Sequence, residues 1–142
     1  MEFERGGVFK ARLLVEEAPD NTRYLVNAMP LEGTALHCMW SGQGVFAQLK
    51  DFPVNPGENQ QIIGIHPGTV AIEYYPPYMR SRGPRTGVIV TYGPNFYYKN
   101  PYAVHNPLLL VGRIEEDLEE LARIGLRIRR QGGERMRLRL PE

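Results

Sequence analysis

The chain has little of what usually identifies a secreted, membrane or nucleic-acid-binding protein. Its 142 residues include one cysteine, Cys38, so no disulfide can form within the chain, which is typical of a reducing compartment. The formal net charge is +1, which does not favour a nucleic-acid partner. No apolar run approaches the roughly 20 residues that cross a bilayer, and the opening MEFERGG lacks a signal peptide's apolar stretch. We therefore expect a cytoplasmic protein with no membrane or nucleic-acid partner.

Motifs of metal, phosphate and nucleophile sites are also missing. The three histidines, His37, His66 and His105, show no H-x-H or H-x₃-H spacing, and there is no cysteine cluster. The chain has neither a G-x-S-x-G nucleophile elbow nor a G-x₄-G-K-[ST] phosphate loop. A fold can bring distant ligands together, but these patterns predict no metal and no cofactor.

What the chain does contain is typical of a soluble globular domain. The hydrophobic fraction is 42% and the charged fraction is 23%. A chain of this length buries about 70% of its unfolded surface, which is enough for a core without a metal or disulfide. We see no repeat or linker, so residues 1–142 are interpreted as one domain.

The middle of the chain concentrates tyrosine and arginine. Between residues 59 and 113 the only acid is Glu73, and seven of the eight tyrosines lie there. Tyrosine with arginine is typical of recognition surfaces, although tyrosine also favours strands. Three interpretations stay open: ordinary strand tyrosines, a ligand site and a subunit interface. An exposed aromatic patch of this density is rare on monomers, so we expect a homo-oligomer, most simply a homodimer.

Hydrophobic periodicity predicts mostly strands. Strands are expected at residues 8–16, 34–40, 45–49, 69–75 and 87–92, with a hairpin turn at residues 41–44. A short helix is predicted between Asp20 and Pro30, and a longer one from Asn106 and Pro107 to Gly125. Residues 126–129 and 135–140 alternate apolar residues with arginine around QGGE, which predicts a terminal hairpin. The fold class is therefore mainly β, a barrel with two helices.

The adjacent His37 and Cys38 are not a catalytic pair. Neighbours on a strand point to opposite faces, so their side chains cannot come within hydrogen-bond reach of each other. Cys38 would share its face with Leu36 and Trp40 and is predicted to be a buried, unreactive core residue. His37 would then look outward and be free for another role.

Glu73 is conspicuous as an isolated acid on an apolar strand. The segment TVAIEYY places Glu73 and Tyr75 on one face, and Val70 and Ile72 on the other. Such an acid is solvated, paired with an arginine or held ready as a general base. For the paired interpretation the candidate partners are Arg85 and Arg113.

Several of these segments together resemble a known family. LEGTALHCMWSGQGVF, PGTVAIEYY, VIVTYGPNFYY, ELARIGLRI and QGGERMRLRL are similar to an uncharacterised bacterial family of cyclophilin-like fold, a domain of unknown function. The resemblance implies a closed β-barrel of about eight strands with two capping helices. The chain lacks the phenylalanine-histidine-arginine context of prolyl isomerases of this fold, so that activity is not expected.

These observations lead to a functional hypothesis. We expect a barrel that binds a small anionic or amide-bearing metabolite, and whether it also turns that metabolite over stays open. The alternative is a non-catalytic oligomerising or accessory subunit. The candidate catalytic residues are His37 and Glu73. The candidate ligand-binding residues are Tyr75, Arg85, Tyr92 and His105.

Overall fold

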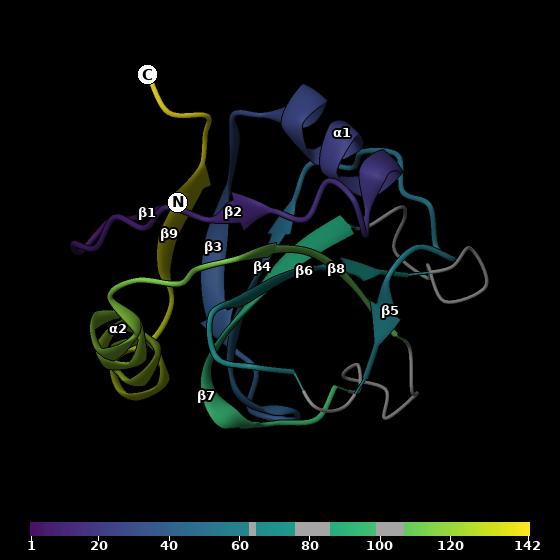
Figure 1. The fold of residues 1–142 in the computed structure, drawn as a ribbon. Helices are drawn as coiled ribbons and strands as arrows, with labels where there is room; N and C mark the ends of the chain where they lie inside the picture. Colours follow the sequence, from purple (N-terminus) through teal and green to yellow (C-terminus); the bar gives the residue numbers. More distant parts are fainter. Residues whose placement is uncertain (63–64, 76–85, 99–106) are drawn as a thin grey trace.

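The computed structural model describes residues 1–62, 65–75, 86–98 and 107–142, and Figure 1 shows their arrangement. The described residues form one nine-stranded sheet and two helices. The strands are β1 (Glu2–Phe3), β2 (Arg12–Leu13), β3 (Leu31–His37), β4 (Gly42–Leu49), β5 (Gln60–Gln61), β6 (Thr69–Tyr74), β7 (Thr86–Phe96), β8 (Leu108–Arg113) and β9 (Glu134–Leu138). The helices are α1 (Pro19–Ala28) and α2 (Leu118–Gln131).

The sheet curls into an open half-barrel, so the closed barrel expected from the sequence is wrong. Its strand order is β1-β9-β3-β4-β7-β6-β8-β2, with β5 paired to β8, and all pairs are antiparallel. β1 and β2 lie at the two ends of this order and are only two residues long. Strands this short cannot supply a ladder that joins the two edges, and the sheet stays open between them.

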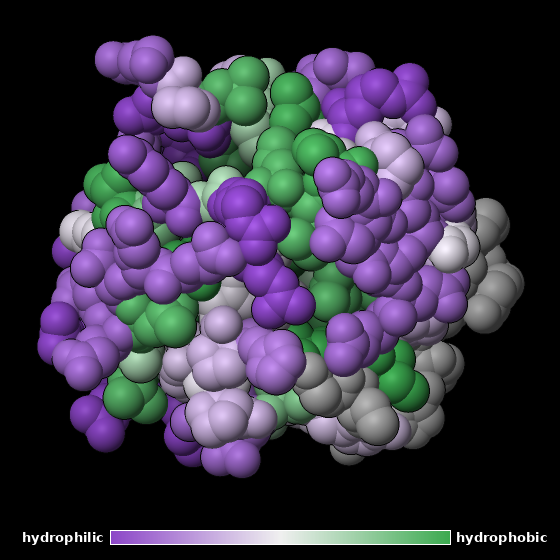
Figure 2. All heavy atoms as spheres, in the orientation of Figure 1, coloured by the Kyte–Doolittle hydropathy of each residue, from purple (hydrophilic) through white to green (hydrophobic). Residues whose placement is uncertain are grey.

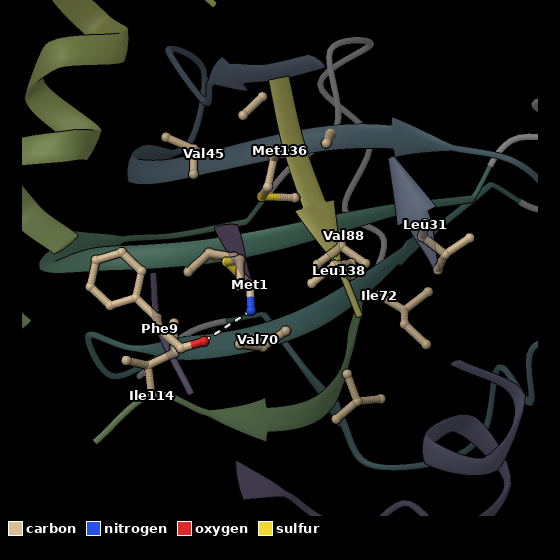
Figure 3. Packing of buried hydrophobic residues seen from close by; sticks show 14 of the residues in the cluster. Met1, Phe9, Leu31, Val45, Val70, Ile72, Val88, Ile114, Met136 and Leu138 are labelled. Carbon is tan, nitrogen blue, oxygen red and sulfur yellow. Dashed lines mark hydrogen bonds between the residues drawn. The ribbon is translucent and has the colours of Figure 1, made fainter. Parts of the chain in front are cut away.

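The inner face of the sheet holds the larger hydrophobic core. Figure 3 shows side chains from β3, β4, β6, β7 and β9, among them Leu31, Val45, Ile72, Val88 and Met136, meeting in one cluster. Successive strand residues point to opposite faces, so every second residue enters this core. The predicted alternation of β6, with Val70 and Ile72 in the core, is confirmed.

The N-terminal segment packs on this core without forming the strand predicted at residues 8–16. Phe9 is buried, and the Met1 ammonium donates to the Phe9 carbonyl at 2.9 Å (Figure 3). Val8 is exposed, however, and the chain turns at Gly6 and Gly7, both at positive φ. Because the chain turns at these glycines, the short β2 is the only strand of the segment 8–16 that pairs with β8.

The first predicted helix and the predicted hairpin are both confirmed. α1 has Pro19 at its first position, where a missing N–H costs nothing, and it ends before Pro30. β3 and β4 pair antiparallel, but the turn between them lies at residues 38–41, and most of the turn predicted at residues 41–44 belongs to β4.

The long helix predicted from residue 106 to residue 125 is wrong in its position. The run from Leu108 to Val111 is completely buried and forms β8, because apolar residues on both faces suit a strand covered on both sides. The helix starts only after Asp117 and continues through Gly125. It ends at Gly132, whose φ of 92° suits a residue without a Cβ.

The predicted terminal hairpin is wrong as well. Residues 126–129 belong to α2, and their arginines alternate with apolar residues on a helix rather than on a strand. β9 does alternate as expected, with Met136 and Leu138 buried, but it pairs with β1 and β3.

Candidate functional site

A second hydrophobic cluster lies on the outer face of the half-barrel. It joins side chains from the outer faces of β4, β6, β7 and β8 with residues of the connecting segments. Its buried members are Leu14, Cys38, Phe46, Ile65, Ala71, Ile89, Phe96, Tyr98, Leu108 and Leu110, and Trp40 packs against them. The middle strands are therefore covered on both faces, and polar groups on their outer face are also withdrawn from water.

Glu73 of β6 is buried on this outer face. Its exposed fraction is 1%, and its Oε1 atom accepts hydrogen bonds from the Tyr75 hydroxyl at 2.6 Å and the Tyr98 hydroxyl at 2.8 Å. Two donors use both lone pairs of that oxygen. Among residues 1–62, 65–75, 86–98 and 107–142, no group forms a hydrogen bond with the other carboxylate oxygen, Oε2.

The burial of Glu73 changes its acid strength. Withdrawal from water raises the pKa of the carboxyl above its ordinary value, and the two tyrosine hydrogen bonds only partly oppose this effect. The predicted pairing of Glu73 with Arg113 is not seen in the described part of the chain, and Arg85 lies outside it. Among the described residues no cation pairs with this acid, so its carboxyl keeps a proton to a higher pH than an ordinary glutamate does.

Gly87 makes room for the Glu73 carboxyl. The two residues are directly opposite each other on β6 and β7. A Cβ at position 87 would lie 3.2 Å from Glu73 Oε2 and 3.0 Å from the Ala47 carbonyl oxygen. The side chain of Glu73 thus lies over a strand position where any larger residue would crowd it.

Cys38 is buried in the same outer cluster. The prediction that it is buried is confirmed, and burial, with the nearby Glu73 carboxyl, raises the pKa of its thiol well above the ordinary value. Its predicted face is wrong in one respect, because Cys38 lies on the outer face, while Ala35 and His37 face the inner core. Leu36, expected in the core, is 44% exposed.

His37 lies on the inner face, bonded to Tyr92. Its Nε2 atom lies 2.6 Å from the Tyr92 hydroxyl, and its Nδ1 atom is buried with no partner among the described residues. Burial and the positive charge of Arg129 on α2 lower the pKa of His37, whereas burial raises that of Tyr92. The neutral imidazole is therefore the favoured form beside Tyr92.

The structure separates His37 from Glu73. His37 is in register with Val45, Val90 and Val70, whereas Glu73 is three residues further along β6. The two backbones are thus three strand spacings of about 4.8 Å and three residues of about 3.3 Å apart in the sheet. Their side chains also point to opposite faces, so the predicted cluster divides into a Glu73–Tyr75 part and a His37–Tyr92 part.

The remaining predicted residues, Arg85 and His105, lie outside the described residues. The carbonyl of His66 accepts hydrogen bonds from Thr69 and Thr91. Within the described part of the chain, no three histidine, cysteine, aspartate or glutamate side chains are grouped so that they could hold a metal ion.

Two residues of the outer site were not among the sequence candidates. Tyr98 belongs to the tyrosine-rich region, but nothing local showed that it, rather than a neighbour, would reach Glu73. Trp40 was assigned to the core, yet its indole Nε1 is buried without a hydrogen-bond partner in the described residues. A buried indole N–H usually has a hydrogen-bond partner. The chain's single tryptophan was therefore the sequence signal that could have pointed to this site.

The arginine-rich surface of β9 is neutralised locally. Arg135 and Arg137 both pair with Glu32, and Arg139 pairs with Glu2. A hollow of about 270 Å³ lies among the same charged residues, with Glu4 on its wall. Carboxylates beside the arginines cancel the positive field that a polyanion would need. Figure 2 likewise shows hydrophilic and hydrophobic residues interleaved on the face it displays.

Comparison with protein families places the chain in a family. The family model described as "Protein of unknown function (DUF3830)" matches residues 3–140. The chain belongs to the DUF3830 family. A search of curated proteins finds no match. Among the described residues, no helix has the length and apolar character needed to span a membrane.

Among the solved structures similar to this DUF3830 chain, McbB shares its fold. McbB, whose structure was solved in complex with tryptophan, has a TM-score of 0.67 at 19% sequence identity. The match covers 99% of this chain and 44% of McbB, so the DUF3830 chain spans less than half the length of that protein. A hypothetical protein from Archaeoglobus fulgidus, AF2241, has a TM-score of 0.43 at 21% identity, over 80% of this chain and 76% of its own.

Proposed function

We propose that this DUF3830 chain binds a small molecule on the outer face of β6 and β7, at Glu73. The observation that carries the proposal is the buried Glu73 Oε2 atom, for which the described residues supply no hydrogen-bond partner. Leaving a buried polar group unsatisfied costs about 1–3 kcal/mol, and more when the group is charged. A ligand that forms a hydrogen bond with this oxygen recovers that free energy on binding.

The chemistry of the site favours an amide-bearing ligand over an anionic one. Tyr75 and Tyr98 already occupy Oε1, so the ligand meets Oε2, and the hydrophobic cluster around it suits a mostly apolar molecule. A carboxylate ligand would need a positively charged partner. In this proposal, binding of an anionic ligand depends on Arg85 and His105 to supply that charge.

The same carboxyl suits proton transfer. Burial raises the pKa of Glu73, so its carboxyl holds to a higher pH than an ordinary glutamate a proton that it can donate to a bound ligand. We therefore include general acid chemistry on a bound ligand in the proposal, with Glu73 as the catalytic residue. His37 and Tyr92 form a separate polar pair on the inner face of the sheet, and this pair stays a second candidate site.

The other sequence expectations continue as parts of this proposal. They are a single domain over residues 1–142, a cyclophilin-like architecture of bacterial origin, a cytoplasmic location, and no metal or cofactor. The similarity to McbB supports the shared fold, and its complex with tryptophan is loosely compatible with small-molecule binding.

A second candidate function is that of an accessory or oligomerising subunit. Leu36, Met39 and Tyr97 are 44%, 67% and 43% exposed, although each is large and apolar or aromatic. The Tyr97 amide bonds to the Ser41 carbonyl, so all three residues surround the turn between β3 and β4. Exposed apolar residues that gather in this way suit a protein contact.

A thermal-shift screen tests the ligand proposal. The compounds are neutral lactams, ureas and hydantoins, with simple carboxylates as the anionic class. We expect a neutral amide to stabilise the wild-type chain, by about 2.7 kcal/mol at 100 times its Kd. Glu73→Met, which removes both oxygens at similar size, should abolish this shift, and Glu73→Gln should keep part of it.

The control is Glu16→Met, the same change at an exposed position with no hydrogen bond or ion pair in the described structure. It should respond to the ligand as the wild type does. If no compound stabilises the wild type, or if Glu73→Met and Glu73→Gln respond fully, the proposed site is wrong.

A further inference from the structure

We infer that Tyr75 and Tyr98 are positioning residues that place the proton of Glu73 on its Oε2 atom, so that the site takes a ligand through a carbonyl oxygen. This inference rests on the proposed function and names the ligand class of the same site. The observation that carries it is the unequal surroundings of the two carboxyl oxygens. Oε1 has two hydrogen-bond partners, whereas Oε2 is buried and has none among the described residues.

The two tyrosine hydroxyls reach the same oxygen from different parts of the chain. Tyr75 directly follows β6, and its hydroxyl lies 2.6 Å from Oε1. Tyr98 comes after the end of β7, and its hydroxyl lies 2.8 Å from the same atom. Both tyrosines are buried, so water does not compete for their protons. An oxygen that accepts two hydrogen bonds has used both lone pairs, and in a protonated carboxyl this is the carbonyl oxygen.

The proton of the carboxyl is then left on Oε2. This atom lies over Gly87 of the neighbouring strand, where a Cβ would be 3.2 Å away. No described cation pairs with Glu73, and its burial keeps the carboxyl protonated to a higher pH than an ordinary glutamate. The protonated side chain thus offers an O–H donor that the described residues leave without an acceptor.

A buried donor of this kind selects its ligand by one group. A ligand must present an acceptor to Oε2, and a neutral carbonyl compound supplies one without bringing a charge into the hydrophobic outer cluster. A ketone, an ester and a tertiary amide all qualify, so the N–H of an amide is not required. A ligand that can only donate finds no acceptor until Glu73 loses its proton.

Glu73 is also the group through which binding responds to pH. The titratable described side chains that face it are Cys38, Tyr75 and Tyr98, and none of them is a cation. Burial and the Glu73 carboxyl raise the pKa of Cys38 and of Tyr98, so both stay protonated when Glu73 titrates. Affinity for a carbonyl ligand should therefore fall as the pH rises through the folded-state pKa of Glu73.

Calorimetric titration with three neutral rings tests the ligand class. The compounds are a lactam, its N-methyl derivative, which can only accept, and a pyrrole, which can only donate. At pH 4.5 we expect the wild type to bind both lactams about tenfold more tightly than the pyrrole, with this preference lost at high pH. Glu73→Gln keeps an acceptor for the tyrosines and an N–H in place of the O–H, so its affinity for the N-methyl lactam should not change with pH. Glu73→Met should lose the preference.

Infrared difference spectra of wild type against Glu73→Gln test the positioning by the tyrosines. They report the C=O stretch of the protonated Glu73 carboxyl. Tyr75→Phe and Tyr98→Phe each remove a hydrogen bond from the carbonyl oxygen, so each should move this band to higher frequency. Tyr24→Phe is the control, because its ring packs against the inner core, and it should leave the band in place. If the proton were on Oε1, the C=O group would be Oε2, and neither tyrosine variant would move the band in this way.

The outcomes separate the inference from the proposed function. Binding of the parent lactam that depends on Glu73, with the N-methyl lactam bound no better than the pyrrole, overturns the inference alone. Lactam affinity that rises with pH, or an infrared band that neither tyrosine variant moves, does the same. Binding that is unaffected by Glu73→Met, or no binding by any compound, overturns both. If a tyrosine variant fails to fold, the pH profiles of the wild type and Glu73→Gln decide.

Discussion

Glu73 makes the stability of the protein depend on pH. Burial raises the folded-state pKa of its carboxyl above 4.5, so the folded chain holds this proton more tightly than the unfolded chain does. The contribution of Glu73 to the unfolding free energy is therefore fully present below pH 4.5. It is lost as the pH rises from 4.5 through the folded-state pKa.

Urea unfolding of the wild type and of Glu73→Gln, measured from pH 4.5 upward, checks this sign. We expect the wild type to lose stability relative to Glu73→Gln as the pH rises, because glutamine has no proton to release. The exposed Glu16→Gln variant should run parallel to the wild type. A Glu73→Gln curve that also stays parallel to the wild type would show that the carboxyl is ionised at no cost in the folded chain.

The sequence was informative about single residues where alternation alone decides the outcome. Glu73 and Tyr75 do share a face, and Cys38 is buried. It was not informative about which face was the core, because β3 runs between two clusters and apolar residues occur on both of its faces. The bond between His37 and Tyr92 joins residues 55 apart in the chain, and no local pattern encodes such a contact.

At the scale of elements, helix α2 lies close against the sheet at Gly125. A Cβ at this position would overlap the ring of Tyr92 on β7. Alanine is normally the better helix residue by about 1 kcal/mol, so propensity alone predicts that Gly125→Ala stabilises the chain. Overpacking costs about 1–3 kcal/mol and opposes this gain.

We therefore predict that Gly125→Ala lowers the unfolding free energy by up to about 2 kcal/mol, the overpacking cost less the helix gain. Denaturant unfolding measures it. In a Tyr92→Leu background, where the ring is absent, the same substitution should cost much less, because the two residues are in contact. An equal cost in both backgrounds would mean that the helix does not rest on Tyr92.

The same helix shows why element boundaries were hard to predict. Leu110, Ile114, Leu118 and Leu121 have helical spacing, but the first two are strand and post-strand residues and the last two belong to α2. The apolar run of β8 is covered on both faces, and such a run has no alternation to distinguish it from a helix. By contrast, β6 and β7 were predicted because they are rich in β-branched residues, which favour strands.

At the scale of the whole molecule, the sequence predicted the mainly-β architecture with two helices correctly. It did not predict that the curled sheet stays open. Whether a curled sheet closes depends on pairing between strands at opposite ends of the strand order. Here those strands are β1 and β2, and each has only two residues. Residues 8–16 alternate in sequence, but the turn at Gly6 and Gly7 redirects them away from a full ladder.

The exposed apolar residues lead to a prediction about the assembly. Leu36, Met39 and Tyr97 surround the turn between β3 and β4, and we expect this surface to join two copies in a homodimer. Light scattering should then give twice the 16.2 kDa chain mass.

Met39→Glu places a charge in the middle of the contact and should shift the protein to a monomer, because burying an unpaired charge is costly. Val15→Glu, a matched change at another exposed apolar residue, should leave the mass unchanged. A wild-type mass of 16.2 kDa at high concentration would contradict the dimer.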